Sequence, residues 1–446
     1  MINMKEKIEK EYGGKCECGK AHEVILEDIR IGSHILEEIP DLVRKHGSKV
    51  FMISDRNTWN AAGKEVASIL KQEGMLTGSW CFEQEKVEPD ETAVGAVLMH
   101  FNKDCDYIVV VGSGTLNDIG KLTSAVTGRP FMIVGTAPSM DGFASATSSV
   151  IRDGLKISLG TTAPVAFLAD VSIMKDAPAR LLQAGIGDMF AKYISICEWR
   201  ISHVINGEYY CPKIASLVRN ALDRCAKNAK ALMKRDEEAV AAVTEGLVYA
   251  GLAMAMAGVS RPASGMEHYF SHVWDMRGEE FGTPADYHGI QCGIATGICI
   301  RIYDQIRRIT PDYETARKYV DAFSWEAWKE QLKDFLGRSA DAMIALEEKE
   351  QKYDPATHPA RFNRIAENWD SILKIIEEEM PTLDEYEHLM EEIGLTETYE
   401  DLGHSTEETR LTFYATKDIR DKYIGSRLLW DLGMLETVGE EIFRAI

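Results

Sequence analysis

The chain has 446 residues, of which 45% are hydrophobic and 27% charged, an ordinary globular composition with enough length for two domains. Its 71 acidic and 50 basic residues give a formal net charge of −21, which argues against nucleic acid or an anionic membrane surface as the main partner. The nine cysteines are odd in number and scattered, so we expect reduced thiols in a cytoplasmic protein rather than a secreted disulfide framework.

The N-terminal segment contains a short group of metal-binding residue types. The start, MINMKEKIEKEY, is charged and amphipathic and does not read as a secretory signal. Cys16 and Cys18 are followed closely by His22, but a complete zinc site needs about four ligands, and no fourth lies nearby in the sequence. We therefore interpret these residues as structural.

The first third of the chain alternates short β-branched runs with helical patterns, which is typical of βαβ units and a parallel sheet. Buried strands are predicted at Val50–Ile53, Tyr107–Val111 and Phe131–Val134, and a last one at Val165–Asp170. From about residue 176 onward the periodicity is helical. We expect a Rossmann-like α/β domain over residues 1–170 and an all-helical domain over 171–446.

The most apolar long stretch covers residues 239–259 and is rich in alanine and glycine. It contains Glu245, so a buried helix is favoured over a membrane span. We expect no membrane insertion.

A glycine-rich turn follows the strand Tyr107–Val111. In Gly112-Ser113-Gly114-Thr115-Leu116, glycines allow backbone N–H groups to approach a diphosphate, and the helix that follows adds a favourable dipole. Because the third glycine of a G-x-G-x-x-G pattern is absent, the same turn is also explained by tight strand-to-helix packing.

Two further strand ends carry polar groups. Asp55 follows the strand Val50–Ile53, where a carboxylate can bind the adenosine ribose and favour NAD over NADP, although a turn or helix cap is the simpler explanation. A second turn follows Phe131–Val134 and contains Thr136, Ser139 and Ser145. Turns on neighbouring strand ends form a groove at one edge of the sheet.

Histidines cluster in the helical part. His268 and His272 are four residues apart, on one helix face, and His288 comes at a predicted helix start. Asp188 lies in an apolar helix beginning, with Lys192 expected on the same face one turn on, but an N-terminal cap also explains this aspartate. One carboxylate and two imidazoles suit Zn²⁺, Fe²⁺ or Ni²⁺.

Taken in order, these motifs resemble one family. Gly-x-Gly-x-x-x-Asp-x-x-Lys, Thr-Ala-Pro-Ser-x-Asp-Gly-x-Ala-Ser, Gly-Asp-x-x-x-Lys, Arg-Pro-Ala-Ser-Gly-x-Glu-His and Tyr-His-Gly occur between Gly112 and Gly289. They are similar to glycerol-1-phosphate dehydrogenase, of the iron-containing alcohol dehydrogenase and dehydroquinate synthase superfamily. C-terminal segments at 415–423 and 428–433 resemble its longer bacterial branch.

The resemblance implies a dehydroquinate synthase-like architecture and a role for each motif residue. It implies metal ligation by Asp188, His268 and His288, with substrate contacts from Asp141, Asp188 and His272. Catalysis would involve His272, Asp141 and Lys192. The cofactor NAD, with NADP as the alternative, would contact Asp55, Gly112, Ser113, Gly114, Thr115, Leu116, Thr136, Ser139 and Ser145.

The implied reaction is reversible reduction of dihydroxyacetone phosphate to sn-glycerol 1-phosphate, by a homo-oligomer with one divalent metal. Zinc is usual in the family, nickel is associated with the bacterial branch, and iron is a third option. Lys192, Lys156 and Arg261 are the cations considered for the substrate phosphate, and the sequence does not rank them.

Three alternatives stay open. One is a dehydroquinate synthase-like enzyme that eliminates phosphate, although the Glu metal ligand of that branch is not found. The second is a glycerol or other polyol dehydrogenase acting on an unphosphorylated substrate. The third is a non-catalytic metal- or nucleotide-binding protein. Ser113 in place of the usual middle glycine and Met266 before Glu267 depart from the family pattern without removing a ligand.

Overall fold

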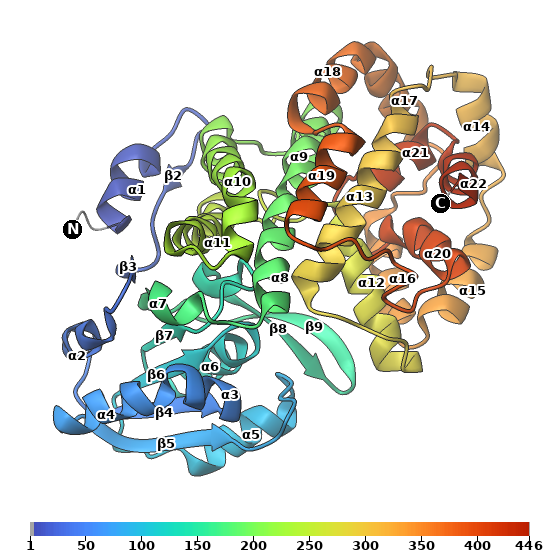
Figure 1. The fold of residues 1–446 in the computed structure, drawn as a ribbon. Helices are drawn as coiled ribbons and strands as arrows, with labels where there is room; N and C mark the ends of the chain where they lie inside the picture. The colour runs from blue at the N-terminus through green and yellow to red at the C-terminus, as the bar shows by residue number, and fades with distance from the viewer. Residues whose placement is uncertain (1–3, 446) are drawn as a thin grey trace. The chain divides into compact units, whose positions relative to one another are not determined.

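The computed structural model describes residues 4–445 and contains one parallel six-stranded sheet (Figure 1). The strand order is β3-β10-β7-β6-β4-β5, and every neighbouring pair is parallel. All four predicted strands are confirmed, as β4, β6, β7 and β10. The bounds are β3 (Asp28–Gly32), β4 (Val50–Asp55), β5 (Leu76–Phe82), β6 (Tyr107–Gly112), β7 (Phe131–Gly135) and β10 (Ala166–Asp170).

The chain reverses its direction of travel across the sheet between β4 and β6. From β4 it passes to β5 at one edge, and it then crosses back to β6, which pairs with the other side of β4. Ligands of open α/β sheets bind outside the carboxyl ends of the strands at such a switch point. The carboxyl ends of β4 and β6 are Asp55 and Gly112, which are residues singled out from the sequence.

Two antiparallel ribbons lie outside this sheet. The shorter pairs β1 (Gly14–Lys15) with β2 (Ala21–His22), and the longer pairs β8 (Thr147–Arg152) with β9 (Leu155–Gly160). Neither ribbon shows the long apolar run of a buried strand, which is why the sequence did not predict them.

The chain divides into two compact units. The first contains Met1–Met189 and Pro212–Ser260, and the second contains Phe190–Cys211 and Arg261–Ile446. Residue 170 marks the end of the sheet, and as a domain boundary it stays a prediction. By their contacts, α10 and α11 belong to the first unit.

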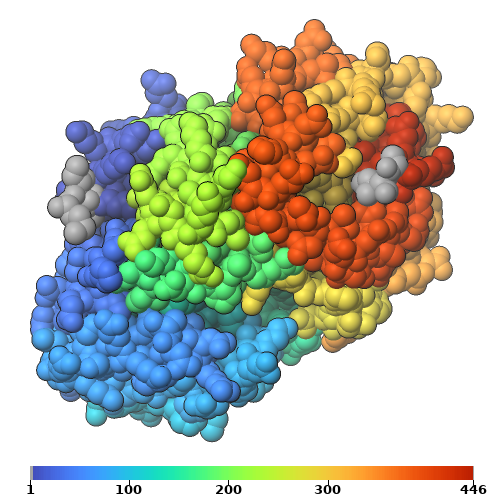
Figure 2. Space-filling model, viewed as in Figure 1, coloured from blue at the N-terminus to red at the C-terminus, as the bar shows by residue number. Residues whose placement is uncertain are grey.

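The first unit contains helices between its strands, and further helices follow the last strand. In Figure 2 the dark blue N-terminal segment lies beside the yellow-green surface of α10, and the Tyr12 hydroxyl lies 3.3 Å from Asn220 Nδ2. The helices are α1 (Met4–Tyr12), α2 (Ile39–Arg44), α3 (Arg56–Thr58), α4 (Lys64–Gln72), α5 (Glu91–His100), α6 (Gly114–Thr127), α7 (Val171–Met174), α8 (Ala179–Phe190), α10 (Pro212–Met233) and α11 (Glu237–Ala257).

Helix α11 contains the apolar stretch that the sequence predicted as a buried helix. It is long and apolar enough to cross a membrane, and 78% of its most apolar window is buried inside the protein. Asp236 caps its first turn, and Gly258 ends it in the left-handed conformation. Such burial is common for a core helix.

The described residues of the second unit form helices joined by loops, with no strand among them. It begins with α9 (Lys192–Asn206) and continues with α12 (Met266–Phe281) and α13 (His288–Ile306). The rest are α14 (Tyr313–Asp321), α15 (Trp325–Leu336), α16 (Ser339–Glu350), α17 (His358–Glu367), α18 (Trp369–Glu379), α19 (Leu383–Glu392), α20 (Thr406–Thr416), α21 (Gly425–Asp431) and α22 (Leu435–Ala445). The helix start predicted at His288 is confirmed.

One local prediction is wrong. Asp188 is not at a helix beginning and does not cap an N-terminus, because it is near the carboxyl end of α8. Nor does one helix carry both Asp188 and Lys192, since α8 ends at Phe190 and α9 starts at Lys192. No proline or glycine marks the interruption at Ala191, so composition gave no sign of it.

Candidate nucleotide and metal sites

The turn between β6 and α6 has the geometry of a diphosphate-binding turn. A Cβ added to Gly112 would lie 2.7 Å from Cβ of Leu116, so a larger residue does not fit there. Ser113 is the N-cap residue, yet its side chain does not cap the helix; its hydroxyl lies 3.1 Å from the carbonyl oxygen of Ala137. The first N–H groups of α6 are thus not capped by Ser113, and a helix start of this kind favours an anion.

Gly120 lies where α6 packs against its own strand. A Cβ there would approach Cγ2 of Val110 to 2.5 Å. Close helix-to-strand packing is one of the functions of the third glycine in a dinucleotide-binding turn. The G-x-G-x-x-G spacing does not predict this glycine, because its third position falls on Asn117.

Side-chain hydrogen bonds join the two predicted turns to each other. The hydroxyl oxygens of Ser113 and Ser139 lie 2.5 Å apart. The backbone N–H of Thr136 donates to the Gly112 carbonyl at 3.1 Å. These contacts place the turns after β6 and β7 side by side, as predicted from the sequence.

Lys121, on α6, holds the turn that follows β7 in place through hydrogen bonds. Its buried Nζ donates to Gly142 O at 2.7 Å, Ser145 Oγ at 2.9 Å and Thr147 O at 2.8 Å. Burial lowers the pKa of Lys121 and raises that of Asp118, which lies 3.4 Å away. Ser145 is therefore held by Lys121. Lys121 ends the Gly-x-Gly-x-x-x-Asp-x-x-Lys motif, but the motif alone does not predict this role.

Asp55 has a structural role that is visible in the fold. Its Oδ1 accepts from the Thr58 N–H at 2.8 Å, and its own N–H donates to Thr58 Oγ1 at 3.0 Å. This reciprocal pair is a capping box that starts α3. The helix-cap alternative is confirmed, and the ribose contact stays a prediction.

Asp141 and Asp188 are joined within the first unit. The backbone N–H of Asp141 donates to Asp188 Oδ2 at 2.9 Å, and both residues are buried. Gly185 is one turn earlier in α8, where a Cβ would lie only 1.7 Å from the Pro138 carbonyl oxygen. The absence of a side chain at Gly185 lets α8 reach the second turn.

The three predicted histidines lie together in the second unit, on α12 and at the start of α13. The ring centroids of His268 and His288 are 4.9 Å apart, and His272 stacks on His288 at 5.8 Å. Ligand atoms of His268, His288 and Cys292 all lie within 4.8 Å of one another. The sequence predicted this grouping of histidines but missed Cys292.

Each of the two predicted ligand histidines is held at Nδ1. His268 Nδ1 lies 2.8 Å from Glu267 Oε1, and His288 Nδ1 lies 2.8 Å from Ser271 Oγ. Gln291 in turn donates to Ser271 at 3.2 Å. With Nδ1 engaged, Nε2 is the ring nitrogen that can bind a metal, and such partners orient metal-ligating histidines.

The charges around His268 favour its neutral form. Burial, with further contributions from Lys192 and His288, lowers the pKa of His268 well below its usual value. Burial and the nearby Glu198 raise the pKa of Glu267 to about 8. A neutral imidazole is the form that ligates metals.

The three candidate phosphate-binding cations differ in their surroundings. Arg261 is buried and forms two hydrogen bonds with Glu208, at 2.8 and 2.6 Å, and a third with the Tyr423 carbonyl at 2.8 Å. Lys192 is buried and donates to the Ala263 carbonyl at 3.0 Å. Lys156 is part of β9. The Glu208 carboxylate already neutralises Arg261, which makes it the weakest of the three candidates.

Sequence comparisons relate the chain to known dehydrogenases. Residues 30–178 match the family model described as iron-containing alcohol dehydrogenase. A glycerol-1-phosphate dehydrogenase [NAD(P)+] of Halalkalibacterium halodurans is 34% identical over 322 residues, covering 71% of this chain and 78% of the relative. The enzyme of the same name from Methanosarcina mazei is 35% identical, covering 60% of this chain and 74% of its own length.

Solved structures of other dehydrogenases and oxidoreductases share the fold at low sequence identity. A 1,3-propanediol oxidoreductase aligns with a TM-score of 0.60 at 14% identity, covering 96% of this chain and all of its own. Glycerol dehydrogenase from Schizosaccharomyces pombe aligns at 0.59 and 15%, covering 94% and 91%. Together with the ordered motifs, the identity and coverage of the curated relatives show that the chain belongs to the glycerol-1-phosphate dehydrogenase family.

Proposed function

We propose that this protein is an NAD(P)-dependent, metal-dependent dehydrogenase that reversibly reduces dihydroxyacetone phosphate to sn-glycerol 1-phosphate. The main support is the relatives named glycerol-1-phosphate dehydrogenase [NAD(P)+], of which the chain covers up to four fifths. The observation that carries it is the pair of turns after β6 and β7, beside the sheet's switch point, which Ser113 and Ser139 join. The enzyme acts in the cytoplasm as a homo-oligomer.

The dinucleotide lies across the carboxyl ends of β4, β6 and β7. Backbone N–H groups from Gly114 to Leu116 receive the diphosphate at the start of α6. Asp55 binds the adenosine ribose while keeping its cap on α3, since the cap engages Oδ1. The carboxylate then repels a 2′-phosphate, so NAD is preferred over NADP. The other lining residues are Gly112, Ser113, Thr136, Ser139 and Ser145.

The metal is held by Asp188, His268 and His288. This donor set of one carboxylate and two imidazoles is suited to Zn²⁺, Ni²⁺ or Fe²⁺, of which we favour zinc or nickel. The Nδ1 contacts of the two histidines fit this assignment, because they leave Nε2 as the ligating atom. A divalent metal supplies Lewis-acid polarisation of the substrate carbonyl, and the nicotinamide supplies the hydride.

The chain's own side chains bind the substrate and move the proton. His272 stacks on His288 and is four residues from His268, so it delivers a proton to the C2 oxygen of the substrate without ligating the metal. Asp141, whose N–H is fixed by Asp188, binds the substrate hydroxyl. We assign the phosphate to Lys192 or Lys156 rather than to Arg261, whose charge Glu208 neutralises.

The direct test is an assay on purified protein loaded separately with zinc, nickel and iron. Dihydroxyacetone phosphate should cause oxidation of NADH with at least one of these metals. Inactivity with all three would refute the proposal. Oxidation of glycerol in preference to sn-glycerol 1-phosphate would assign an unphosphorylated polyol instead, and phosphate release without net change in NADH would assign the lyase reaction.

Variants of the histidines separate ligands from the proton donor. His268→Ala and His288→Ala should each lose the metal, whereas His272→Ala should keep it and turn over about 100-fold to 10,000-fold more slowly. The exposed His388 gives a matched control, and His388→Ala should change neither property. Equal metal loss in all three variants would refute the division of roles.

A further inference from the structure

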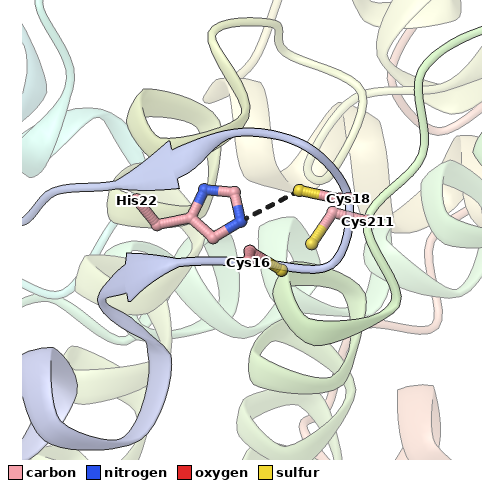
Figure 3. A group of neighbouring side chains, drawn as sticks. All are labelled: Cys16, Cys18, His22 and Cys211. Atoms are coloured by element: carbon pink, nitrogen blue, oxygen red, sulfur yellow. Dashed lines mark hydrogen bonds between the residues drawn. The ribbon is translucent and has the colours of Figure 1, made fainter.

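The hairpin near the N-terminus brings two cysteines and a histidine close to a third cysteine that is distant in the sequence. Sulfur and nitrogen atoms of Cys16, Cys18, His22 and Cys211 all lie within 4.8 Å of one another. Figure 3 shows the four side chains directed toward one another. From these contacts we propose a structural zinc site of the Cys₃His type, separate from the metal site of the dehydrogenase.

Backbone geometry presents the first two cysteines from one tight turn. The Cys16 N–H donates to the Lys20 carbonyl, and the Gly19 N–H donates to the Cys16 carbonyl, both at 3.0 Å. Gly19 has a φ of +87°, which an L side chain rarely adopts, so glycine is required where the turn closes. The turn places the side chains of Cys16 and Cys18 on the same side as His22.

His22 is oriented as a metal ligand. It is buried, and its Nδ1 lies 3.3 Å from the Met256 carbonyl oxygen near the end of α11. A hydrogen bond from Nδ1–H to a carbonyl fixes the tautomer in which Nε2 has the lone pair. That Nε2 lies 3.4 Å from Cys18 Sγ. In tetrahedral zinc, bond lengths of about 2.3 Å to sulfur and about 2.0 Å to nitrogen separate these atoms by roughly 3.6 Å.

Cys211 completes the set from the start of α10. It is buried and is peptide-bonded to Pro212, the first residue of that helix, so the helix start determines its position. No disulfide joins any of the nine cysteines, all of which the structure describes. Three thiolates and one imidazole are a structural zinc ligand set, whereas soft sulfur ligands exclude Mg²⁺ and Ca²⁺.

The β1–β2 hairpin is too short to be stable without an additional link to the rest of the protein. Its strands β1 and β2 have two residues each, and most of its residues are exposed. A two-stranded hairpin without a hydrophobic face is marginal in water. Beyond the metal, the hairpin is anchored by Lys20 Nζ, which donates to the Ala257 carbonyl at 2.9 Å. Zinc would therefore attach the N-terminal hairpin to the start of α10, beside the contacts of Lys20 and His22 with the end of α11.

Metal analysis of the full-length protein tests the proposal. Purified in the presence of zinc and then dialysed, a His268→Ala/His288→Ala protein should retain about one zinc per chain, bound by the thiolates. Adding Cys16→Ser and Cys18→Ser should remove that zinc, whereas Cys81→Ser, a half-buried cysteine on β5, should leave it in place. Loss of no zinc from the cysteine variants would overturn the proposal.

A measurement on the unmodified protein covers the case in which the variants fail to fold. An organomercurial that reacts with thiolates should release one zinc per chain, and cobalt-loaded protein should show sulfur-to-metal charge-transfer absorption. Release of no zinc, a cobalt spectrum without sulfur bands, or an intact mass showing a disulfide at these cysteines would each overturn the site. None of these outcomes depends on whether the protein reduces dihydroxyacetone phosphate.

Discussion

Gly185 offers the sharpest test of how α8 positions the second turn. Its added Cβ would lie 1.7 Å from the Pro138 carbonyl oxygen, and real Cβ atoms essentially never approach closer than 3.0 Å. In Gly185→Ala the helix and the turn must separate by roughly 1.3 Å, and both are backbone, so no side-chain rotation relieves the clash.

The displacement acts on residues of the proposed site. Asp188 is one helical turn after Gly185, and its bond to the Asp141 N–H joins the same two segments. A misplacement of about 1 Å costs about 100-fold in rate, which is about 2.7 kcal/mol of transition-state stabilisation. We expect kcat/KM to fall by about 100-fold in Gly185→Ala.

Gly185→Ala should also lower the free energy of unfolding, although alanine has the higher helix propensity. Alanine in a helix interior is favoured over glycine by about 0.5–1 kcal/mol, but overpacking costs about 1–3 kcal/mol. Gly95, inside α5, has open space where a Cβ would stand, with no heavy atom within 4 Å, so Gly95→Ala isolates the propensity gain. Thermal melting should show Gly95→Ala at or above the wild type and Gly185→Ala below it. A Gly185→Ala protein with wild-type kinetics and a raised melting temperature would refute the reasoning.

Three other outcomes follow from the site. Asp55→Asn keeps a capping side chain but loses the charge, so steady-state kinetics should show the NADPH-to-NADH preference rising by about tenfold; an unchanged ratio would contradict the ribose contact. Lys121→Met removes the buried cation beside Asp118 and the donor to Gly142, Ser145 and Thr147, and it should cost about 3–5 kcal/mol in urea unfolding, whereas the exposed Lys103→Met should be neutral. Chelation should abolish turnover yet leave NADH binding measurable by fluorescence, and loss of both would show that the metal also holds the dinucleotide site together.

The sequence revealed those parts of the fold that have a local pattern. The strands β4, β6, β7 and β10 are buried and largely apolar, and each was predicted from its apolar run. The edge strand β5 mostly alternates between exposed and half-buried residues, and the ribbon β8–β9 is mostly half-buried or exposed, so neither has such a run. The break between α8 and α9 lacks a helix-breaking residue and was likewise missed.

The candidate sites show the same limit. Motif spacing singled out His268 and His288, but not Ser271 or Glu267 as the partners that orient them, because those bonds depend on helix packing. Cys16, Cys18 and His22 were visible as neighbours in the sequence. Their fourth partner, Cys211, is almost 200 residues further along the chain, where only the folded structure brings it close.

The division of the chain into units has a consequence for its synthesis on the ribosome. Every residue of the first unit is translated before Arg261 emerges, and of the second unit only the segment Phe190–Cys211 precedes that point. Domains generally fold as units, N-terminal first, during translation. The apolar helix α11 is the last helix of the first unit, so the sheet and α10 are already available to cover it when it leaves the exit tunnel. The nascent chain can thus bury α11, its most apolar long helix, against the rest of the first unit before most of the second unit is translated.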